Sequence, residues 1–496
     1  MAKMAQGPTS GAARPWILLA VLLAAAGALT LLWPADVPWI NDEPALLATA
    51  LHANQVGALP THGLLGSVGV PYGPVPLWLY MAGLDLTHDL VALVVLHALL
   101  FVLLTGAAIW WLARTCRGLD PLVGVLALLS PYFWFYSRLL WDNSFLIPLS
   151  ALALAAYVSF SRAPAAWKLW LVGALAALML QTHLMCAPLL AALALHFALR
   201  HRGWARQHWP ALLPLLICAA SCWPYAAALL ARPDLGERRL EPAAGASWIF
   251  PLFGGRYFSA LGLDYFFGAG WQDRGGPLLW AATTVSAMGV VTVWQGLAVA
   301  ARQALRPRDG GQARPAEHDL AALAATTLVL QLLMHAVART GDEPHYLNGT
   351  WFCLFALVWL AYSAIPRTAW RRALAGAHAT ALLVVVLALQ HDVHARQGNT
   401  GLHFGPALGT QMEVLDELGR YGPQSEVVNE TEFYATFPQA FGVLQAFHPV
   451  TQDPAGPRAR LHIRPAAPGT GDGRLAVVAE PLPAAAPAAA PSATPK

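Results

Sequence analysis

The sequence predicts an all-α integral membrane protein, and three observations lead to this class. The chain of 496 residues is 57% hydrophobic and only 11% charged, so it carries more apolar surface than one soluble core buries. Apolar stretches of roughly 16 to 25 residues recur along the first 390 positions, which is the length that an α-helix needs to cross a hydrocarbon core. The shorter alternating segments of a membrane β-barrel are not found.

The first apolar run extends from Trp16 to Trp33 and follows Lys3 and Arg14. Because no small-residue cleavage site precedes Trp33-Pro34, we expect an uncleaved first span. Ten further runs bring the total to about eleven predicted transmembrane helices, at 90–112, 120–136, 145–160, 169–186, 187–199, 210–231, 277–300, 319–338, 350–364 and 377–390.

The basic residues indicate the orientation of these spans. The segments assigned to the cytoplasm hold 16 of the 30 Lys and Arg residues, whereas the outer loops between spans hold 7. This asymmetry predicts a short cytoplasmic N-terminus and a C-terminal segment on the opposite side. Residues 169–199 then form two short spans that bend near Gln181-Thr182-His183, or a re-entrant pair, which satisfies the same charge pattern.

Two short stretches in the first outer loop are too short to cross a membrane. Pro44–Asn54 and Pro74–Leu84 each begin with proline at a plausible first helical turn, and the second carries a Trp and a Tyr. We expect both to be amphipathic juxtamembrane helices that lie along the interface.

The composition becomes more polar after the last predicted span. We therefore divide the chain into a polytopic transmembrane domain at 1–390, a small outer domain at 391–480, and a disordered Pro/Ala tail at 481–496.

Several classes of function do not fit the composition. The net charge of +3, without a basic patch interleaved with aromatics, does not indicate a nucleic-acid partner. The five cysteines lack metal-ligand spacing, so neither a zinc site nor a disulfide framework is predicted.

Four motifs in the expected outer loops carry a resemblance to a known family. They are Trp39-Ile40-Asn41-Asp42-Glu43-Pro44, the stretch from Tyr72 to Trp78, Ser137-Arg138-Leu139-Leu140-Trp141-Asp142-Asn143, and Gln181-Thr182-His183-Leu184. In this order, the chain resembles the polytopic GT-C glycosyltransferases, the superfamily of protein O-mannosyltransferases and lipid A aminoarabinose transferases. The likeness covers residues 15–390 and continues weakly in His345-Tyr346-Leu347.

The resemblance implies an inverting transfer of a sugar from a polyprenyl-phosphate carrier to an envelope acceptor, which is a lipid, a glycan or a protein. Asp42, with Glu43 beside it, would act as the catalytic base or as a ligand of a divalent metal ion. A carboxylate at the mouth of a span reaches both a lipid phosphate and a water-borne hydroxyl. Asn41-Asp42 before Pro44 is also a good helix N-cap, which is the structural alternative.

Further residues are candidates for the same site. Arg138 would bind the donor phosphate, and Asp142 would bind a metal ion or the acceptor. Alternatively, these two residues, four positions apart, would form a plain ion pair. His183 would contact phosphate or carry a proton, unless it is an ordinary buried histidine. Arg339 and Tyr346 complete the predicted donor-phosphate set, although Tyr346 also suits an interfacial anchor.

One departure from the family limits what the resemblance implies about the sugar. Aminoarabinose transferases carry a basic residue just before the prolines of the first loop, where this chain has Tyr72-Gly73-Pro74. Phosphate recognition then depends on Arg138, Arg256, Arg339 or a metal ion, and the donor sugar stays open.

Two other functions compete with glycosyl transfer. A transporter or flippase for lipid-linked glycans would place ionisable residues inside its spans, and few are found here. A non-catalytic partner of another envelope protein is the second alternative. The Arg- and Ala-rich composition is typical of bacteria with GC-rich genomes, so we expect a multi-pass protein of the bacterial inner membrane with its site on the periplasmic side.

Overall fold

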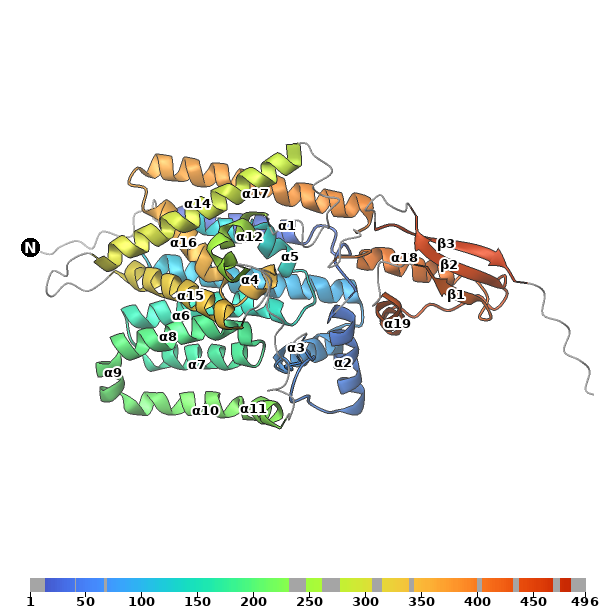
Figure 1. Ribbon diagram of the computed structural model, residues 1–496, viewed down its shortest axis with the longest axis horizontal. Coiled ribbons are helices and arrows are strands. Elements are labelled where there is room, and N and C mark those ends of the chain that lie inside the picture. The colour runs from blue at the N-terminus through green and yellow to red at the C-terminus, as the bar shows by residue number, and fades with distance from the viewer. Residues whose placement is uncertain are drawn as a thin grey trace, which may run out of the picture.

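The computed structural model describes residues 14–40, 42–66, 69–231, 247–260, 277–305, 315–338, 343–398, 404–430, 437–466 and 473–482. These residues form an elongated helical part and a smaller C-terminal segment that projects from one of its ends (Figure 1). The chain is a multi-pass membrane protein and predominantly helical, as the sequence predicts.

The helical part is built from α-helices and short 3-10 helices. The first half of the chain contributes α1 (Arg14–Thr30), α2 (Asp42–Val56), α3 (Val75–Leu86), α4 (Leu90–Thr115), α5 (Pro131–Tyr136), α6 (Leu146–Arg162), α7 (Ala166–Leu180), α8 (Ala187–Arg200), α9 (Arg202–Gln207), α10 (Leu213–Ser221) and α11 (Trp223–Leu230). The second half contributes α12 (Gly254–Ala260), α14 (Pro277–Leu305), α15 (Ala316–Ala338), α16 (Trp351–Ser363) and α17 (Thr368–Arg396). The 3-10 helices are η1 (Pro121–Ala127), η2 (Asn143–Phe145), η3 (Leu184–Cys186), η4 (Trp209–Leu212), η6 (Ser247–Phe253) and η8 (Pro344–Leu347).

Among the described residues, five helical segments are long and apolar enough to cross a membrane, and a sixth forms if the pair 209–221 and 223–230, bent by 43°, is one span. Shorter apolar helices occupy five more positions, including α1, α7 and α16. The predicted count of about eleven spans therefore stays a prediction.

The run at 120–136 differs from the expected continuous helix. It consists of η1 followed by the separate short helix α5, which begins at Pro131 behind the N-cap Ser130. Pro131 has no N–H to continue the preceding helix, and the Ser130 hydroxyl accepts from the backbone N–H of Tyr132 at 3.2 Å. Hydrophobicity alone does not reveal this break.

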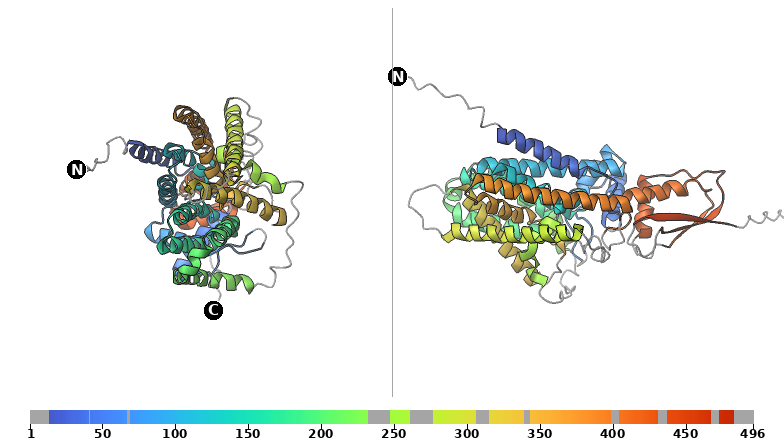
Figure 2. Two further views of the ribbon diagram at one scale, coloured as in Figure 1. Left: turned by 90° about the vertical axis from the view of Figure 1, so that its left-hand side faces the viewer. Right: turned by 90° about the horizontal axis from the view of Figure 1, so that it is seen from above.

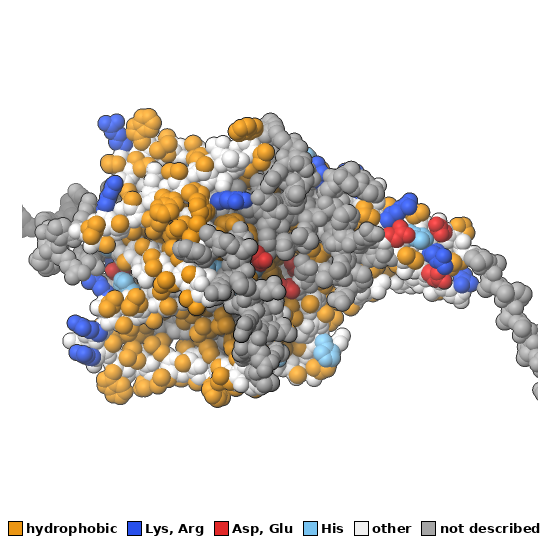
Figure 3. Space-filling view, in the orientation of Figure 1, with side chains coloured by type: hydrophobic (Ala, Val, Ile, Leu, Met, Phe, Trp, Pro, Cys, Tyr) orange, Lys and Arg blue, Asp and Glu red, His pale blue; other side chains and the backbone are white. Residues whose placement is uncertain are grey.

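Helices cover both stretches, as α2 and α3, at the end of the helical part from which the C-terminal segment projects (Figure 1), and their amphipathic, interfacial character stays a prediction. The short helix α9 lies at the opposite end. On the face shown in Figure 3, Lys and Arg side chains of the helical part gather mainly at the α9 end, and apolar side chains cover the middle. This distribution agrees with a belt of lipid contact between two polar ends.

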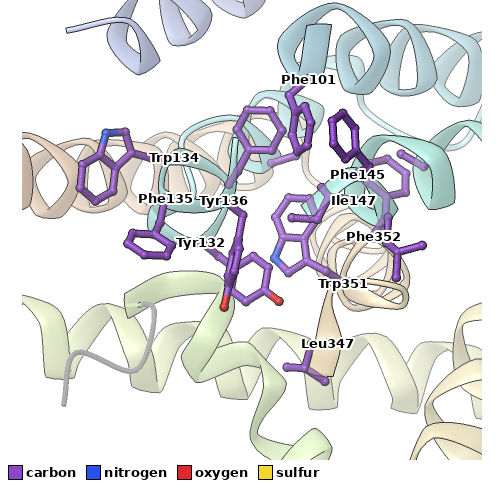
Figure 4. Packing of buried hydrophobic residues seen from close by; sticks show 14 of the residues in the cluster. Phe101, Tyr132, Trp134, Phe135, Tyr136, Phe145, Ile147, Leu347, Trp351 and Phe352 are labelled. Atoms are coloured by element: carbon purple, nitrogen blue, oxygen red, sulfur yellow. The ribbon is translucent and has the colours of Figure 1, made fainter. Parts of the chain in front are cut away.

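Aromatic side chains fill the centre of the helical part beside α5 (Figure 4). Tyr132 stacks on Trp351, with ring centroids 5.7 Å apart, and Phe101 packs against Phe145 at 5.6 Å. Tyr132, Phe101 and Trp351 are fully buried. This packing fixes α5, and with it the motif that follows at Ser137–Asn143.

The C-terminal segment contains a sheet, for which the sequence predicted no element. Its elements are α18 (Leu408–Leu418), β1 (Glu426–Asn429), α19 (Phe437–Phe447), β2 (Ala459–Pro465) and β3 (Leu475–Pro481). The order is β1-β2-β3, with β1 parallel and β3 antiparallel to β2. The helix α17 extends to Arg396 and runs along the helical part toward this segment (Figure 2), so the transmembrane helix ends later than the predicted boundary at 390.

Backbone contacts join the C-terminal segment to the chain that follows α1. The N–H groups of Leu408 and Gly409 donate to the carbonyls of Val37 and Ala35, at 2.9 and 3.0 Å. The indole of Trp39 donates to the carbonyl of Ala440 at 3.0 Å. The division into separate domains stays a prediction, and the tail from residue 483 onward lies outside the described residues.

Candidate active site

The structure brings the predicted acidic residues of two motifs together. Asp42 is the first residue of α2, and its Oδ2 accepts a hydrogen bond from the indole Nε1 of Trp141 at 2.8 Å. The Trp141 ring packs edge-on against His345, with centroids 4.9 Å apart. Segments as far apart in sequence as positions 42 and 345 therefore meet around Asp42. The sequence identified the motif that contains Trp141, but it gave no signal that Trp141 donates to Asp42.

Asp142 lies in the same cluster and is almost completely buried, with 1% of its surface exposed. Its Oδ1 accepts from the backbone N–H of Asn143 at 2.6 Å, and its Oδ2 has no hydrogen-bond partner. A buried oxygen without a partner is rare in proteins, because it forgoes the hydrogen bonds that water would provide. The Oδ2 of Asp142 therefore retains an unused capacity for a hydrogen bond inside the cluster.

The two carboxyl groups have different electrostatic surroundings. Burial raises the pKa of Asp42, while the hydrogen bond from Trp141 lowers it in part. The pKa of Asp142 lies well above its usual range, first because of burial and then because of the negative charge of Asp42. Glu43, only 5% exposed, adds a smaller effect of the same sign on Asp142. Burial raises both pKa values, and the neighbouring carboxylates raise that of Asp142 further, so Asp142 is the carboxyl group of the pair that favours the protonated form more strongly.

A buried amide network holds the Asp142 segment in place. The side-chain amide of Asn348 donates to Asn143 Oδ1 at 2.8 Å, and Asn348 Oδ1 accepts from the hydroxyl of Tyr132 at 2.5 Å. All three side chains are at most 1% exposed. Sequence reasoning missed Asn348 and Tyr132, since each gains its role only from partners more than 200 positions away.

The Tyr72 and Gln181 motifs contact each other through their main chains. The N–H groups of Gly73 and Val75 donate to the carbonyls of Thr182 and Gln181, at 3.2 and 3.0 Å. A Cβ atom on Gly73 would lie 1.8 Å from the carbonyl oxygen of Gln181. Only glycine permits this approach.

His183 is 7% exposed, and its ring packs on that of Tyr72, with centroids 4.3 Å apart. Its Nδ1 accepts from the N–H of Met185 at 3.1 Å, which places the ring proton on Nε2. This Nε2 has no partner, so His183 presents a buried donor.

Arg138 does not form the ion pair with Asp142 that was one of the two alternatives. The helix α5 ends at Tyr136, so the two residues do not share a helical face. The Arg138 Nη2 donates instead to the backbone carbonyls of Trp33 and of Asp36, the latter at 3.2 Å. Burial lowers the pKa of Arg138 to about 10, and its guanidinium lies 5.3 Å from the ring of Trp134. A direct contact of Arg138 with phosphate stays a prediction.

The remaining candidates lie beside His345 or outside the described residues. Tyr346 packs on His345 with centroids 4.4 Å apart, and burial together with Glu343 raises the pKa of Tyr346 to about 12. Arg339 lies outside the described residues. Among the residues that the structure describes, no group of three or more His, Cys, Asp or Glu side chains is arranged to hold a metal ion.

A cavity of about 640 Å³ lies between η6, α12 and α14. Its lining is mostly apolar and includes Phe250, Phe253, Tyr257 and Val290, together with the exposed side chain of Arg256. An apolar cavity with one cationic group has the chemistry that a lipid phosphate requires.

The architecture resembles a solved structure. The crystal structure of ArnT from Cupriavidus metallidurans bound to undecaprenyl phosphate matches 95% of this chain and 98% of that chain, with a TM-score of 0.51 and 12% sequence identity. The chain has a GT-C-type fold. This confirms the resemblance at the level of the fold, and at 12% identity it extends no further. No protein-family model and no curated protein sequence matches the chain.

Proposed function

We propose that the chain is an inverting glycosyltransferase that moves a sugar from a polyprenyl-phosphate carrier to an envelope acceptor at the outer face of the bacterial inner membrane. The observation that carries this proposal is the pair of carboxyl groups, Asp42 and Asp142, gathered with His183 and Tyr72 at one end of a GT-C-type helical part. The solved relative in fold binds undecaprenyl phosphate, which supports a polyprenyl carrier here.

In the proposed reaction, Asp42 acts as the base. It accepts the proton of an acceptor hydroxyl while the oxygen attacks the anomeric carbon of the sugar from the face opposite the carrier. The bond between the anomeric carbon and the phosphate oxygen breaks, and the phosphate keeps the electron pair. The hydrogen bond from Trp141 holds the Asp42 carboxylate in one orientation.

The other residues have supporting roles. Protonated Asp142 donates from its unpartnered Oδ2 to an oxygen of donor or acceptor, and the Nε2–H of His183 donates to a phosphate oxygen. Arg256 is exposed toward an apolar cavity and suits the carrier phosphate and chain better than Arg138, which is 3% exposed. Glu43, Tyr346 and Arg339 stay candidates without a more specific role.

The variant Asp42→Asn tests the assignment of the base. The amide oxygen still accepts from Trp141, so the local structure is retained, but the amide does not accept the proton. We expect turnover to fall on the order of 10²–10⁴-fold. Near-normal turnover would remove Asp42 from the mechanism.

Thermal stability provides the control for this variant. Burial raises the pKa of Asp42 in the folded protein above its value of about 4 in the unfolded chain. The folded wild type therefore loses stability as pH rises from about 4 through the folded-state pKa, because the buried carboxyl group must ionise. At neutral pH Asp42→Asn is therefore expected to be at least as stable as the wild type, with no gain below about pH 4.

The assay uses purified protein in proteoliposomes with a set of undecaprenyl-phosphate-linked sugars, and it follows both transfer to acceptor and movement of lipid. Movement of the lipid-linked sugar without transfer would indicate the transporter or flippase instead. Glu43→Gln is the matched variant, since it changes the neighbouring carboxyl group and leaves Asp42 in place.

A further inference from the structure

A separate cavity, of about 520 Å³, lies where the C-terminal segment meets the ends of α1 and α17. Its lining includes Trp33, Asp36, His394, Gln397, Glu413 and Arg474. The volume is within the range of small-molecule sites, roughly 300–1,000 Å³. None of the residues of the acidic cluster around Asp42 and Asp142 lines it, so it is a different site.

Two aromatic rings form one wall of this cavity. Trp33 and His394 stack with centroids 4.4 Å apart and planes only 11° apart. Trp33 is 38% exposed and the side chain of His394 is 49% exposed. A partly exposed indole face with negative π density suits the polarised C–H groups on the flat side of a sugar ring.

The polar groups around the rings provide both hydrogen-bond acceptors and donors. Asp36 and Glu413 contribute carboxylates, and Gln397 and Arg474 contribute an amide and a guanidinium. Gln397 Nε2 donates to Glu413 Oε2 at 3.4 Å, and Arg474 donates to the carbonyl of Ala395 at 2.8 Å. A hydroxyl group both donates and accepts, so a mixed lining of this kind matches a polyhydroxylated ligand rather than a single ion.

The backbone at this cavity is unusual at two positions. Trp33 has a φ of 47° and Gln397 a φ of 54°, and in the described part of the chain these are the only non-glycine residues with positive φ. The left-handed conformation is unfavourable for residues with a Cβ atom, and glycine would adopt it readily. Gln397 is the C-cap of α17, where a left-handed residue is common, so Trp33 is the one of the two whose strain no cap of this kind explains, and both residues line the cavity.

The cavity is joined to the acidic cluster through Arg138. The guanidinium of Arg138 donates to the carbonyls of Trp33 and Asp36, which line the cavity, and the chain continues from Arg138 directly to Trp141 and Asp142. The main chain of the cavity wall at Trp33 and Asp36 is therefore hydrogen-bonded to the segment that carries Trp141 and Asp142.

We propose that this cavity is a second sugar-binding site, which holds a hydroxyl-rich sugar ring of the acceptor against Trp33 while a more distant hydroxyl of that acceptor reaches Asp42. The sugar chemistry follows from the cavity lining. The assignment to the acceptor, rather than the donor, rests on the proposed function.

Saturation-transfer NMR on the full-length protein in detergent, without donor, tests the proposal with glucose, N-acetylglucosamine, cellobiose and chitobiose as probes. We expect at least one probe to bind the wild type and to bind Trp33→Gly and Glu413→Gln at least tenfold more weakly. Because glycine tolerates the backbone at position 33, Trp33→Gly is expected to retain the melting temperature of the wild type. Trp209→Ala, which removes an exposed tryptophan remote in sequence and absent from the lining, is expected to bind normally.

Three results would overturn the proposal: no probe binds the wild type, binding survives in Trp33→Gly, or binding is lost in Asp42→Asn, which would place the sugar at the acidic cluster. Displacement of the probe by an undecaprenyl-phosphate-linked sugar would assign the cavity to the donor and refute the acceptor assignment. Because binding is measured without transfer, failure of the glycosyltransferase assay does not affect these outcomes.

Discussion

Trp141→Phe separates catalysis by Asp42 from simple packing. The substitution removes the indole N–H that donates to Asp42 Oδ2 at 2.8 Å and keeps an aromatic ring against His345. That hydrogen bond stabilises the ionised carboxylate and lowers the pKa of Asp42, against the effect of burial. Without it, protonated Asp42 persists to higher pH.

The size of the effect follows from the contact. A hydrogen bond to a charged group contributes about 1.5–3 kcal/mol, and about 1.4 kcal/mol corresponds to one pH unit in a titration. Because the Trp141–Asp42 contact is only partly buried, we take the lower end of this range. If ionised Asp42 is the base, the acid limb of the kcat/KM profile is expected to move about one pH unit upward, with near-normal activity on the alkaline side.

The assay measures kcat/KM for transfer between pH 4 and 9 in purified wild type, Trp141→Phe and Trp351→Phe. In the control, Trp351 is fully buried and its Nε1 has no hydrogen-bond partner. Trp351→Phe therefore replaces a buried indole by a smaller ring without removing a hydrogen bond. An unmoved acid limb in Trp141→Phe, or a uniform loss of activity at every pH, would refute the role assigned to Asp42.

Four further predictions follow from the described contacts. Gly73→Ala is expected to lower both the melting temperature and the rate of transfer, because its Cβ overlaps the Gln181 carbonyl. The control Gly376→Ala has open space around it and is expected to raise the free energy of unfolding by about 0.5–1 kcal/mol. Equal stabilities of the two variants would contradict the loop contact. Asn348→Ala leaves the side chain of Asn143 without its donor and is expected to lower the free energy of unfolding by about 1–3 kcal/mol in denaturant titrations. Arg138→Ala is expected to lower the melting temperature more than Arg138→Lys, because Arg138 donates to the carbonyls of Trp33 and Asp36. A raised donor KM in Arg138→Ala with an unchanged melting temperature would instead assign the phosphate to Arg138. In a cysteine-free background, single cysteines at the exposed positions 52 and 420 are expected to react with an impermeant reagent added on one side of the membrane, and a cysteine at position 206 with the reagent added on the other side. Labelling of 52 and 206 from the same side would refute the topology.

The sequence was sufficient for most helices because hydrophobicity of membrane-spanning length is a local property. It was also sufficient to place Asp42, His183 and Asp142 in one set, since their motifs share an expected side of the membrane. The predicted span missed the break before Pro131, because the apolar length of the run from 120 to 136 outweighed the helix-start signal Ser130-Pro131 within it.

The contacts that position the site depend on residues distant in sequence. Arg138 and Asp142 have helical spacing, but α5 ends before them, and the guanidinium binds two carbonyls 102 and 105 positions away. The pairing of Asn143 with Asn348 spans 205 positions. No pattern within either motif indicates such partners, so these contacts required the folded structure.

The contact between Gly73 and the Gln181 carbonyl has an evolutionary consequence. It fixes the register of two loops through main-chain atoms, so the neighbouring side chains are not required for it. The register therefore depends on position 73 itself, which tolerates no replacement, and not on the side chains of its neighbours in sequence. A search for distant homologues would gain more from this obligatory glycine, and its spacing from the acidic residue at the start of α2, than from any conserved array of polar side chains.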